Sequence, residues 1–240
     1  MDTAGVELRP VLDEVGRINP FFRVEARAEE PGRRPVRDCT VEEARGRVAD
    51  VRRSPAGPGG DPAAVEWRVA ASLFHQGLAT RLLSPVLAAG LCHGVLLDAR
   101  AFDWRPGAPV ELGTGQRTAA RVRGGLVGVA DWIEESVVTG VAARVAEALS
   151  EAGRVAPGLL RGNTAAALAG AVRVLGSDRP KVRADAESVA RDLLARPALA
   201  GTGGYRGVDP EGLAVFRRTT CCLYYRLPGG GLCGDCALRG

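Results

Sequence analysis

Four cysteines late in the sequence are the residues whose type and spacing most clearly allow chemistry. They are Cys221, Cys222, Cys233 and Cys236, in the pattern C-C-x10-C-x2-C. Cys233 and Cys236 form a C-x-x-C knuckle whose two sulfurs can reach one metal ion, and Gly234 eases the tight turn between them. The adjacent pair suits a single small tetrahedral ion poorly, because neighbouring side chains of an extended chain point to opposite faces.

A two-iron cluster relaxes this geometric demand. Each iron of a [2Fe-2S] rhomb takes two thiolates, so four cysteines are enough, and residues 228–231 (PGGG) let the chain fold back to bring the two pairs together. The pattern therefore predicts a [2Fe-2S] cluster, with a four-cysteine zinc site as the structural alternative and a vicinal disulfide as a rarer one. A dithiol redox pair is not favoured, because no thioredoxin-like context precedes Cys233.

Positive charge flanks the predicted cluster in the sequence. Cationic groups and N–H donors near an anionic cluster raise its reduction potential. The arginines concerned are Arg217, Arg218, Arg226 and Arg239.

The remaining cysteines and histidines are interpreted as packing residues. Cys39 and Cys92 are isolated, and Cys92 falls in an apolar helical stretch, so both resemble small buried apolar side chains. His75 and His93 lack the paired spacing of metal ligands. Because the sequence has no P-loop, dinucleotide fingerprint or G-x-S-x-G elbow, electrons must arrive from another carrier.

The composition is that of an ordinary globular chain. It is 46% hydrophobic and 25% charged over 240 residues, which is enough to bury a core. The net charge is only +4, the arginines are spread along the chain and 5% of residues are aromatic, so nucleic-acid binding is not expected.

The sequence also predicts a cytoplasmic location. Residues 1–22 contain acidic side chains and no uninterrupted apolar core, unlike a secretory signal. The longest apolar stretch, residues 82–97, is interrupted by polar and turn residues and is shorter than the roughly 20 residues that cross a bilayer. In a reducing compartment, six cysteines are more often thiols or metal ligands than disulfides.

The elements that must position the cysteines are mainly helical. Thr40 and Glu43 form a capping box that predicts the start of a helix, and Ser84 with Pro85 predicts a fresh helix start within a long apolar stretch. Apolar residues at helical spacing support the remaining helices. The predicted helices cover 41–53, 64–83, a segment beginning at Pro85, 131–151, 157–175 and 182–195.

A small amount of β-structure is expected beside these helices. Residues 21–28 favour a short strand, and residues 94–98 with 102–112, turning at Pro106 and Gly107, favour an antiparallel hairpin that 117–123 extends. The expected fold class is α+β, predominantly α-helical, with a small antiparallel β-sheet and a C-terminal cluster-binding segment that contains the four cysteines.

The same signals predict the organisation of the chain. The turn-forming residues 54–62 indicate a flexible linker, and the glycine-rich stretch 201–207 breaks the last helix. The predicted parts are a small N-terminal lobe (1–53), the linker (54–62), a mainly helical body (63–210) with a β-hairpin near 94–123, and a cluster-binding segment (211–240).

Around the four cysteines, the sequence resembles the FhuF family of ferric-siderophore reductases, whose signature is C-C-x10-C-x2-C. The resemblance is strongest over 214–239. Weaker similarity extends to ASLFHQGLATRLLSPVLAAG (71–90) and LLRGNTAAALAGA (159–171), which are similar to the family's helices in position and character. In the second stretch, Arg161 stands where tryptophan is expected before Gly162 and Asn163.

The resemblance implies a cytoplasmic reductase of siderophore-bound iron(III), with the cluster as the immediate one-electron donor. It also implies a distant similarity in fold to part of the siderophore synthetases. The reaction is chemically reasonable, because hard oxygen ligands such as hydroxamates hold iron(III) far better than iron(II). Outer-sphere transfer needs close approach and a suitable potential, so no general acid or base is predicted.

The expected partners are a ferric siderophore as substrate and an electron donor such as a ferredoxin or a flavin reductase. Peripheral membrane association rests on the biology of the family alone, because the sequence shows no basic amphipathic helix or lipidation signal. Two other functions stay open: a zinc-stapled interaction module, and a [2Fe-2S] sensor or electron carrier without reductase activity.

Overall fold

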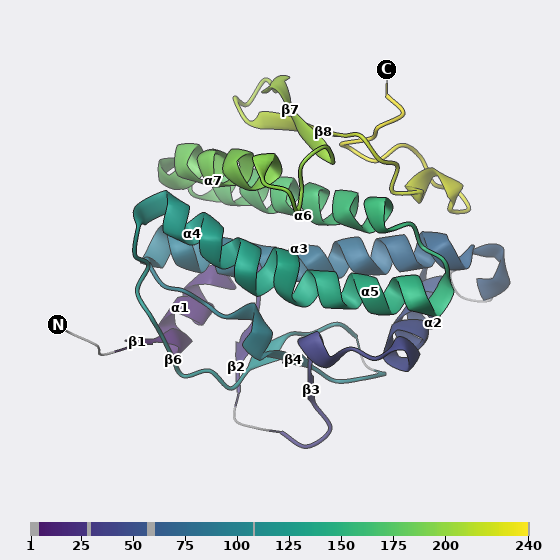
Figure 1. The fold of residues 1–240 in the computed structure, drawn as a ribbon, viewed down its shortest axis with the longest axis horizontal. Helices are drawn as coiled ribbons and strands as arrows, with labels where there is room; N and C mark the ends of the chain where they lie inside the picture. Colours follow the sequence, from purple (N-terminus) through teal and green to yellow (C-terminus); the bar gives the residue numbers. More distant parts are fainter. Residues whose placement is uncertain (1–4, 28–29, 57–60, 108, 240) are drawn as a thin grey trace.

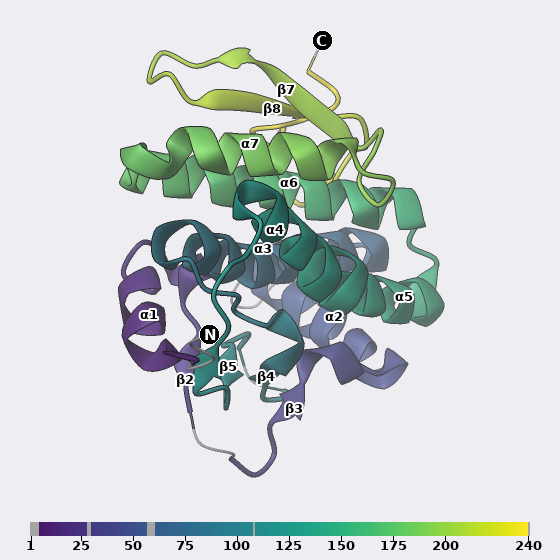
Figure 2. The ribbon, with the colours of Figure 1, turned by 60° about the vertical axis from the view of Figure 1, so that its left-hand side comes forward.

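The computed structural model describes residues 5–27, 30–56, 61–107 and 109–239. Figures 1 and 2 show layers: a small sheet with α1 at one side, two layers of helices in the middle, and a β-hairpin with the cysteine-bearing segment at the other side. The helices are α1 (Leu8–Val15), α2 (Val41–Ala56), α3 (Trp67–His93), α4 (Gly125–Ile133), α5 (Ala142–Gly153), α6 (Pro157–Asp178) and α7 (Arg183–Ala195). The mainly helical α+β class is therefore confirmed.

Helix α2 begins with the predicted capping box. The hydroxyl of Thr40 accepts a hydrogen bond from the Glu43 N–H at 3.2 Å, and the Glu43 carboxylate accepts one from the Thr40 N–H at 2.9 Å. These reciprocal bonds satisfy two N–H groups that the first turn would otherwise leave unpaired. The helix then runs through residues 54–56 of the predicted linker, and residues 57–60 of that linker lie outside the described part of the chain.

Helix α3 is one continuous helix, so the predicted new start at Ser84 and Pro85 was wrong. Pro85 lies inside the helix, although a proline there removes an N–H and usually costs about 3 kcal/mol. The turn around it is buried, with Leu83 and Val86 almost inaccessible, so packing stabilises the helix through the proline. Gly94 then ends the helix with φ 65°, a left-handed conformation that glycine adopts without strain.

The next helical stretch is longer than predicted. It runs from α4 through a π-helical segment (Glu134–Val141) into α5, whereas the sequence indicated 131–151. Gly140 has a non-helical backbone at the bend, and a Cβ there would lie 2.5 Å from the Glu135 carbonyl oxygen. Helices α6 and α7 match the predictions for 157–175 and 182–195 closely.

The sheet near the N-terminus is mixed. Its order is β2-β5-β4-β3, where β2 (Glu25–Ala26) pairs parallel with β5 (Gly113–Thr114), and β5 pairs antiparallel with β4 (Phe102–Trp104). The predicted hairpin is present in part: β4 and β5 are its strands, with β5 just beyond the predicted 102–112, whereas residues 94–98 form no strand of this sheet. The expected third strand differs: β6 (Thr118–Ala119) pairs with β1 (Val6–Glu7), and Arg121 bridges to Val95.

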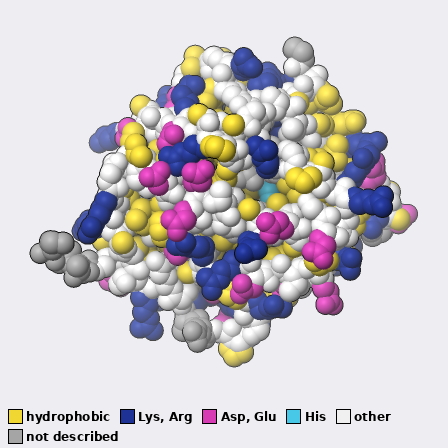
Figure 3. All heavy atoms as spheres, viewed as in Figure 1, with side chains coloured by type: hydrophobic (Ala, Val, Ile, Leu, Met, Phe, Trp, Pro, Cys, Tyr) yellow, Lys and Arg dark blue, Asp and Glu magenta, His cyan; other side chains and the backbone are white. Residues whose placement is uncertain are grey.

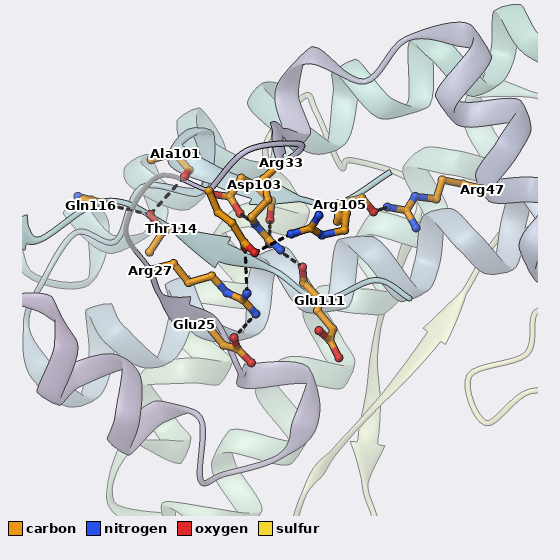
Figure 4. Close-up of polar contacts among 11 residues, drawn as sticks. Glu25, Arg27, Arg33, Arg47, Ala101, Asp103, Arg105, Glu111, Thr114 and Gln116 are labelled. Carbon is orange, nitrogen blue, oxygen red and sulfur yellow. Dashed lines mark hydrogen bonds and ion pairs between the residues drawn. The ribbon is translucent and has the colours of Figure 1, made fainter. Parts of the chain in front are cut away.

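Polar contacts tie β3 (Arg34–Pro35) and its flanks to this sheet (Figure 4). The Arg33 side chain is only 6% exposed; its guanidinium pairs with the Asp103 carboxylate and donates to the Asp103 and Glu111 carbonyl oxygens, each at 3.1 Å. Arg47 of α2 stacks 4.5 Å from the Trp104 ring and donates to the Arg105 carbonyl oxygen at 2.7 Å. The described residues of 5–53 therefore share a sheet and a core with the described residues of 94–123, and the predicted domain boundaries stay a prediction.

A second β-hairpin precedes the cysteines. β7 (Gly203–Val208) pairs antiparallel with β8 (Ala214–Arg218), where the sequence indicated only a glycine-rich break. A Cβ on Gly203 would lie 2.4 Å from the Phe216 ring, so glycine is needed for the strands to approach. Tyr205 and Phe216 pack edge to face with centroids 5.8 Å apart, and the hairpin rests on α6 and α7.

One contiguous apolar core joins these elements, from α1 to α7 and β8. Within the described ranges, no helix is both long enough and apolar enough to cross a membrane.

Candidate metal centre

The chain leaves β8 and enters residues 219–239, which we call the cysteine segment. It lies beyond α6, beside the β7–β8 hairpin (Figure 1). Its cysteines form no disulfide, and the sulfur atoms of Cys222 and Cys233 are 3.5 Å apart although eleven positions separate them. The segment thus folds back on itself as its glycines predicted.

This sulfur–sulfur distance suits two thiolates on one iron. Metal–sulfur bonds of about 2.3 Å in a tetrahedral arrangement place two sulfurs about 3.8 Å apart. A [2Fe-2S] centre takes two thiolates per iron, so a pair such as Cys222 and Cys233 is the unit that it requires. In the described part of the chain, no three His, Cys, Asp or Glu side chains gather as ligands of a single ion.

Backbone N–H groups point at two of the sulfurs. The Leu223 N–H donates to Cys221 Sγ and the Leu238 N–H donates to Cys236 Sγ, each at 3.3 Å. Leu223 has φ 67°, a left-handed conformation that is uncommon for a side chain of this size. Such N–H···S bonds are typical of iron–sulfur sites, where they stabilise the anionic cluster.

The cysteines differ in burial. Cys222 and Cys236 are each 3% exposed, whereas Cys221 and Cys233 are partly exposed. Burial, the hydrogen bond with Cys222 and the nearby Asp235 carboxylate raise the pKa of the Cys233 thiol. A thiolate at this position therefore needs a compensating cation, which a metal ion supplies.

Arg218 holds the cysteine segment to the helices. It is 3% exposed and donates to Asn163 Oδ1 at 2.5 Å, to Gln76 Oε1 at 3.0 Å and to the Thr220 carbonyl oxygen at 3.0 Å. Its backbone N–H donates to the Asp235 carbonyl oxygen at 3.0 Å. One residue therefore links α3, α6 and both halves of the segment.

Two further polar side chains complete this network. The Ser72 hydroxyl donates to the Cys222 carbonyl oxygen at 2.7 Å, and Asn163 Nδ2 donates to the Ser72 carbonyl and hydroxyl oxygens at 2.9 and 3.0 Å. Both side chains are fully buried. Because every member has partners, the network fixes Cys222 rather than leaving unpaired groups in the core.

Gly162 allows the segment to come this close to α6. A Cβ at this position would lie 2.0 Å from Thr220 Oγ1, closer than atoms can approach. Arg161, which stands where the family resemblance predicts tryptophan, donates to the carbonyl oxygens of Pro197, Ala198 and Ala200 at 3.0–3.2 Å. Its side chain therefore fixes the chain after α7.

Four residues of this network were not predicted as functional, and Arg218 was predicted only as a positive charge near the cluster. The four are Ser72, Gln76, Gly162 and Asn163, which lie in the two helical stretches that resemble the FhuF family. The available signal was the presence of polar residues in otherwise apolar helices, because such groups are costly unless they are hydrogen-bonded.

The other flanking arginines surround the segment. Arg217 donates to the Cys236 carbonyl oxygen and Arg239 to the Leu232 carbonyl oxygen, each at 3.4 Å. Arg226 forms an ion pair of 3.2 Å with Glu66.

Within the described residues, the side chains of the isolated cysteines and histidines make no hydrogen bond with the cysteine segment. Cys39 and Cys92 pack against the core, and burial raises the pKa of Cys39 to about 12. His75 is buried with Nε2 3.3 Å from the Ala142 carbonyl oxygen, and this burial lowers its pKa to about 4. His93 lies 3.9 Å from the Glu14 carboxylate.

A cavity of about 1050 Å³ opens beside the N-terminal sheet, away from the cysteines. Several arginines line it, but Arg27, Arg33 and Arg100 are already paired with carboxylates. Its charges are therefore largely compensated within the protein.

A helical scaffold that presents a folded cysteine segment with N–H···S bonds fits an iron–sulfur type of metal-binding protein. Residues 218–238 match the FhuF 2Fe-2S C-terminal domain. This match contains all four cysteines and Arg218, so the cofactor is a [2Fe-2S] cluster, and it supports membership of the siderophore-related FhuF family. None of the curated proteins matches the chain.

Proposed function

We propose that the protein is a siderophore-iron reductase of the cytoplasm. In this proposal, one electron at a time passes to iron(III) in a siderophore, and iron(II) is released. The ligands of the [2Fe-2S] cluster are Cys221, Cys222, Cys233 and Cys236. The observation that carries the proposal is the cysteine segment, which matches the FhuF 2Fe-2S domain and is anchored on α3 and α6 through Arg218.

The chain's own residues orient and tune the centre. When bound, the cluster supplies one-electron redox chemistry. The N–H groups of Leu223 and Leu238 stabilise negative charge on the sulfurs, Ser72 fixes the carbonyl of Cys222, and Arg218 adds a buried positive charge. The N–H groups and Arg218 favour the more negative, reduced state of the cluster, and Ser72 holds the cysteine segment in place.

The substrate side of the reaction requires no acid or base. Iron(III) gains one electron, and the hard oxygen ligands hold the resulting iron(II) much more weakly, so the metal dissociates. Outer-sphere transfer of this kind forms no covalent bond with the protein.

Anaerobic purification followed by visible spectroscopy and iron, sulfide and zinc analysis tests the proposal. We expect a brown protein with equal iron and sulfide that bleaches with dithionite. The reduced protein is then mixed with ferric siderophores in the presence of an iron(II) chelator. One iron(II) should form for each reduced cluster that becomes oxidised. A cluster that reoxidises without accelerating iron(II) release would indicate a sensor or carrier, and a colourless zinc protein would indicate an interaction module.

A further inference from the structure

Large apolar side chains are exposed around the cysteines. Tyr224, Tyr225, Leu232 and Leu238 are 40%, 45%, 43% and 55% exposed, and they are four of the seven exposed large apolar residues in the described part of the chain. We call these four residues the cluster face. Single exposed apolar residues are common, but a concentration of them in one short segment is typical of an interaction site.

Chain connectivity places the cluster face next to the cluster. Each of its residues is within three positions of a cysteine of the segment, and three residues span at most about 11 Å. Cys222 and Cys236 are buried, whereas Cys221 and Cys233 are partly exposed. The segment therefore exposes to solvent both its accessible cysteines and these apolar side chains.

Positive charge surrounds the cluster face. Within the described residues, the side-chain hydrogen bonds of Arg217 and Arg239 go to backbone carbonyl oxygens, so no carboxylate neutralises them. Arg226 adds a third guanidinium, shared with Glu66, and Asp235 is the one acidic residue of the segment. Figure 3 shows apolar side chains over this region at the upper right, with basic side chains beside them.

We propose that the cluster face docks an acidic protein that delivers one electron to the cluster. This inference rests on the proposed function, since it requires a redox-active centre. Tyrosine and arginine are favoured at protein interfaces, and a basic rim attracts an acidic partner over a distance. A small apolar patch suits the short-lived contacts of electron-transfer partners, which bury less than about 1,200 Å².

The electron balance is simple. The donor protein is oxidised by one electron, the cluster is reduced by the same electron, and no bond or proton is transferred. A membrane surface fits the face less well, because the segment's only helical turn, Tyr224–Arg226, is too short to lie as an amphipathic helix.

Stopped-flow reduction by an acidic plant-type ferredoxin, kept reduced in excess and without oxygen, tests this proposal. The variants are Tyr225→Ser and the double variant Tyr225→Ser/Leu232→Ser, whose side chains have no role in tuning the cluster. We expect the second-order rate constant to fall about tenfold or more in each, and the rate of the wild type to fall as salt is raised. Reduction by dithionite and the visible spectrum should not change, because neither depends on docking.

A matched control uses exposed residues elsewhere. Val127 of α4 is 62% exposed, and Arg144 of α5 has a side chain 68% exposed, so Val127→Ser/Arg144→Glu should retain the wild-type rate with ferredoxin. Unchanged ferredoxin rates in the cluster-face variants would overturn the proposal. So would loss of binding to anionic vesicles in these variants at unchanged ferredoxin rates, which would assign the face to a membrane. The proposed function is judged separately, by iron(II) release from a ferric siderophore after dithionite reduction, which bypasses the donor.

Discussion

The guanidinium of Arg218 is a buried positive charge whose side-chain acceptors are all neutral oxygens, from Asn163, Gln76 and Thr220. A buried charge is costly unless an opposite charge lies nearby. A [2Fe-2S] cluster bound by four thiolates is anionic, and Arg218 is three residues from the first of these cysteines. We therefore expect the cluster to supply the counter-charge for this arginine, and the arginine to stabilise the reduced state.

Replacing Arg218 should change the redox properties. We expect Arg218→Gln to make the midpoint potential more negative, on the order of 60 mV, which is tenfold in the equilibrium of a one-electron couple. Arg218→Lys should recover part of the shift because it keeps the charge, and Arg206→Gln, on β7, should leave the potential unchanged. A redox titration followed by visible absorbance measures all three, and an unaltered potential in Arg218→Gln would contradict this role.

The cysteine assignment predicts unequal effects of single substitutions. Cys233→Ser should remove most of the visible absorbance of the cluster, because serine is a poor ligand for iron in such a centre. Cys92→Ser should leave the absorbance intact, since Cys92 packs against the core near the end of α3. Spectra of anaerobically purified variants, normalised to protein concentration, test this, and equal loss in both variants would overturn the ligand set.

His75 should make stability depend on pH. Its folded pKa of about 4 is below the ordinary value of 6.5 because burial disfavours the charged ring. The unfolded chain therefore binds a proton first as the pH falls, so stability is complete above about pH 6.5 and declines toward pH 4. From about pH 7.5 to about pH 5.5 the loss should be roughly 1 kcal/mol.

Urea unfolding at these two pH values measures the effect of His75. The His75→Gln variant cannot take up this proton, so its free energy of unfolding should fall by about 1 kcal/mol less over the same range. The same pH dependence in both proteins would show that other groups are responsible.

At the scale of elements, the close contact between α6 and the cysteine segment is the feature that positions the centre. Gly162→Ala should displace Thr220, because the new methyl group would lie 2.0 Å from its hydroxyl, and we expect a large loss of cluster occupancy. Gly170→Ala on the same helix meets no atom within 4 Å and should retain the cluster with equal or greater stability. Iron content and circular dichroism of the two variants make the comparison, and full occupancy in Gly162→Ala would contradict it.

Elements with local signals were predicted well, and elements that depend on distant partners were not. The capping box of Thr40 and Glu43 identified α2, because both bonds lie within four residues. The β7–β8 hairpin was missed because its glycines suggest a break, while its stability comes from packing on α6 and α7. The helix start predicted at Pro85 was wrong for the same reason, because only tertiary burial explains the position of this proline inside α3.

The candidate site also has a part with a local sequence signal and a part that depends on distant residues. The spacing of four cysteines within sixteen positions identified the segment, and the comparison with known families supports its cofactor. The network beneath it could not be predicted, because Arg218 meets Asn163 across 55 positions and Cys222 meets Ser72 across 150. No periodicity relates residues so far apart; only the folded chain does.

At the scale of the whole molecule, the N-terminal sheet and the cysteine segment lie on opposite sides of the helical layers (Figure 2). Helix α3 contacts both regions, through Phe74 beside Trp104 and through Ser72 beside Cys222. The segment itself contributes few side chains to the core, with Cys222 and Cys236 its fully buried ones in the described part. Its order therefore depends more on the metal than the order of the helices does.

Removal of the cluster should therefore loosen one region only. After chelation of the iron, we expect faster hydrogen exchange in residues 219–239, while α3 and α6 keep their protection because their packing is independent of the metal. Exchange followed by mass spectrometry compares the protein with and without the cluster. Loss of protection throughout the molecule would show instead that the cluster holds the entire fold together.

The unequal burial of the cysteines has a further consequence for the access of the electron donor and the substrate to the cluster. Cys222 and Cys236 are buried whereas Cys221 and Cys233 are partly exposed, so in the proposed reaction electrons would enter and leave through the side of Cys221 and Cys233. In the proposed function, a donor protein seated there would exclude the ferric siderophore, so the two half-reactions would have to alternate. The oxidised donor would have to depart before the iron complex could arrive, and a cell that accumulated oxidised donor would slow its own release of iron.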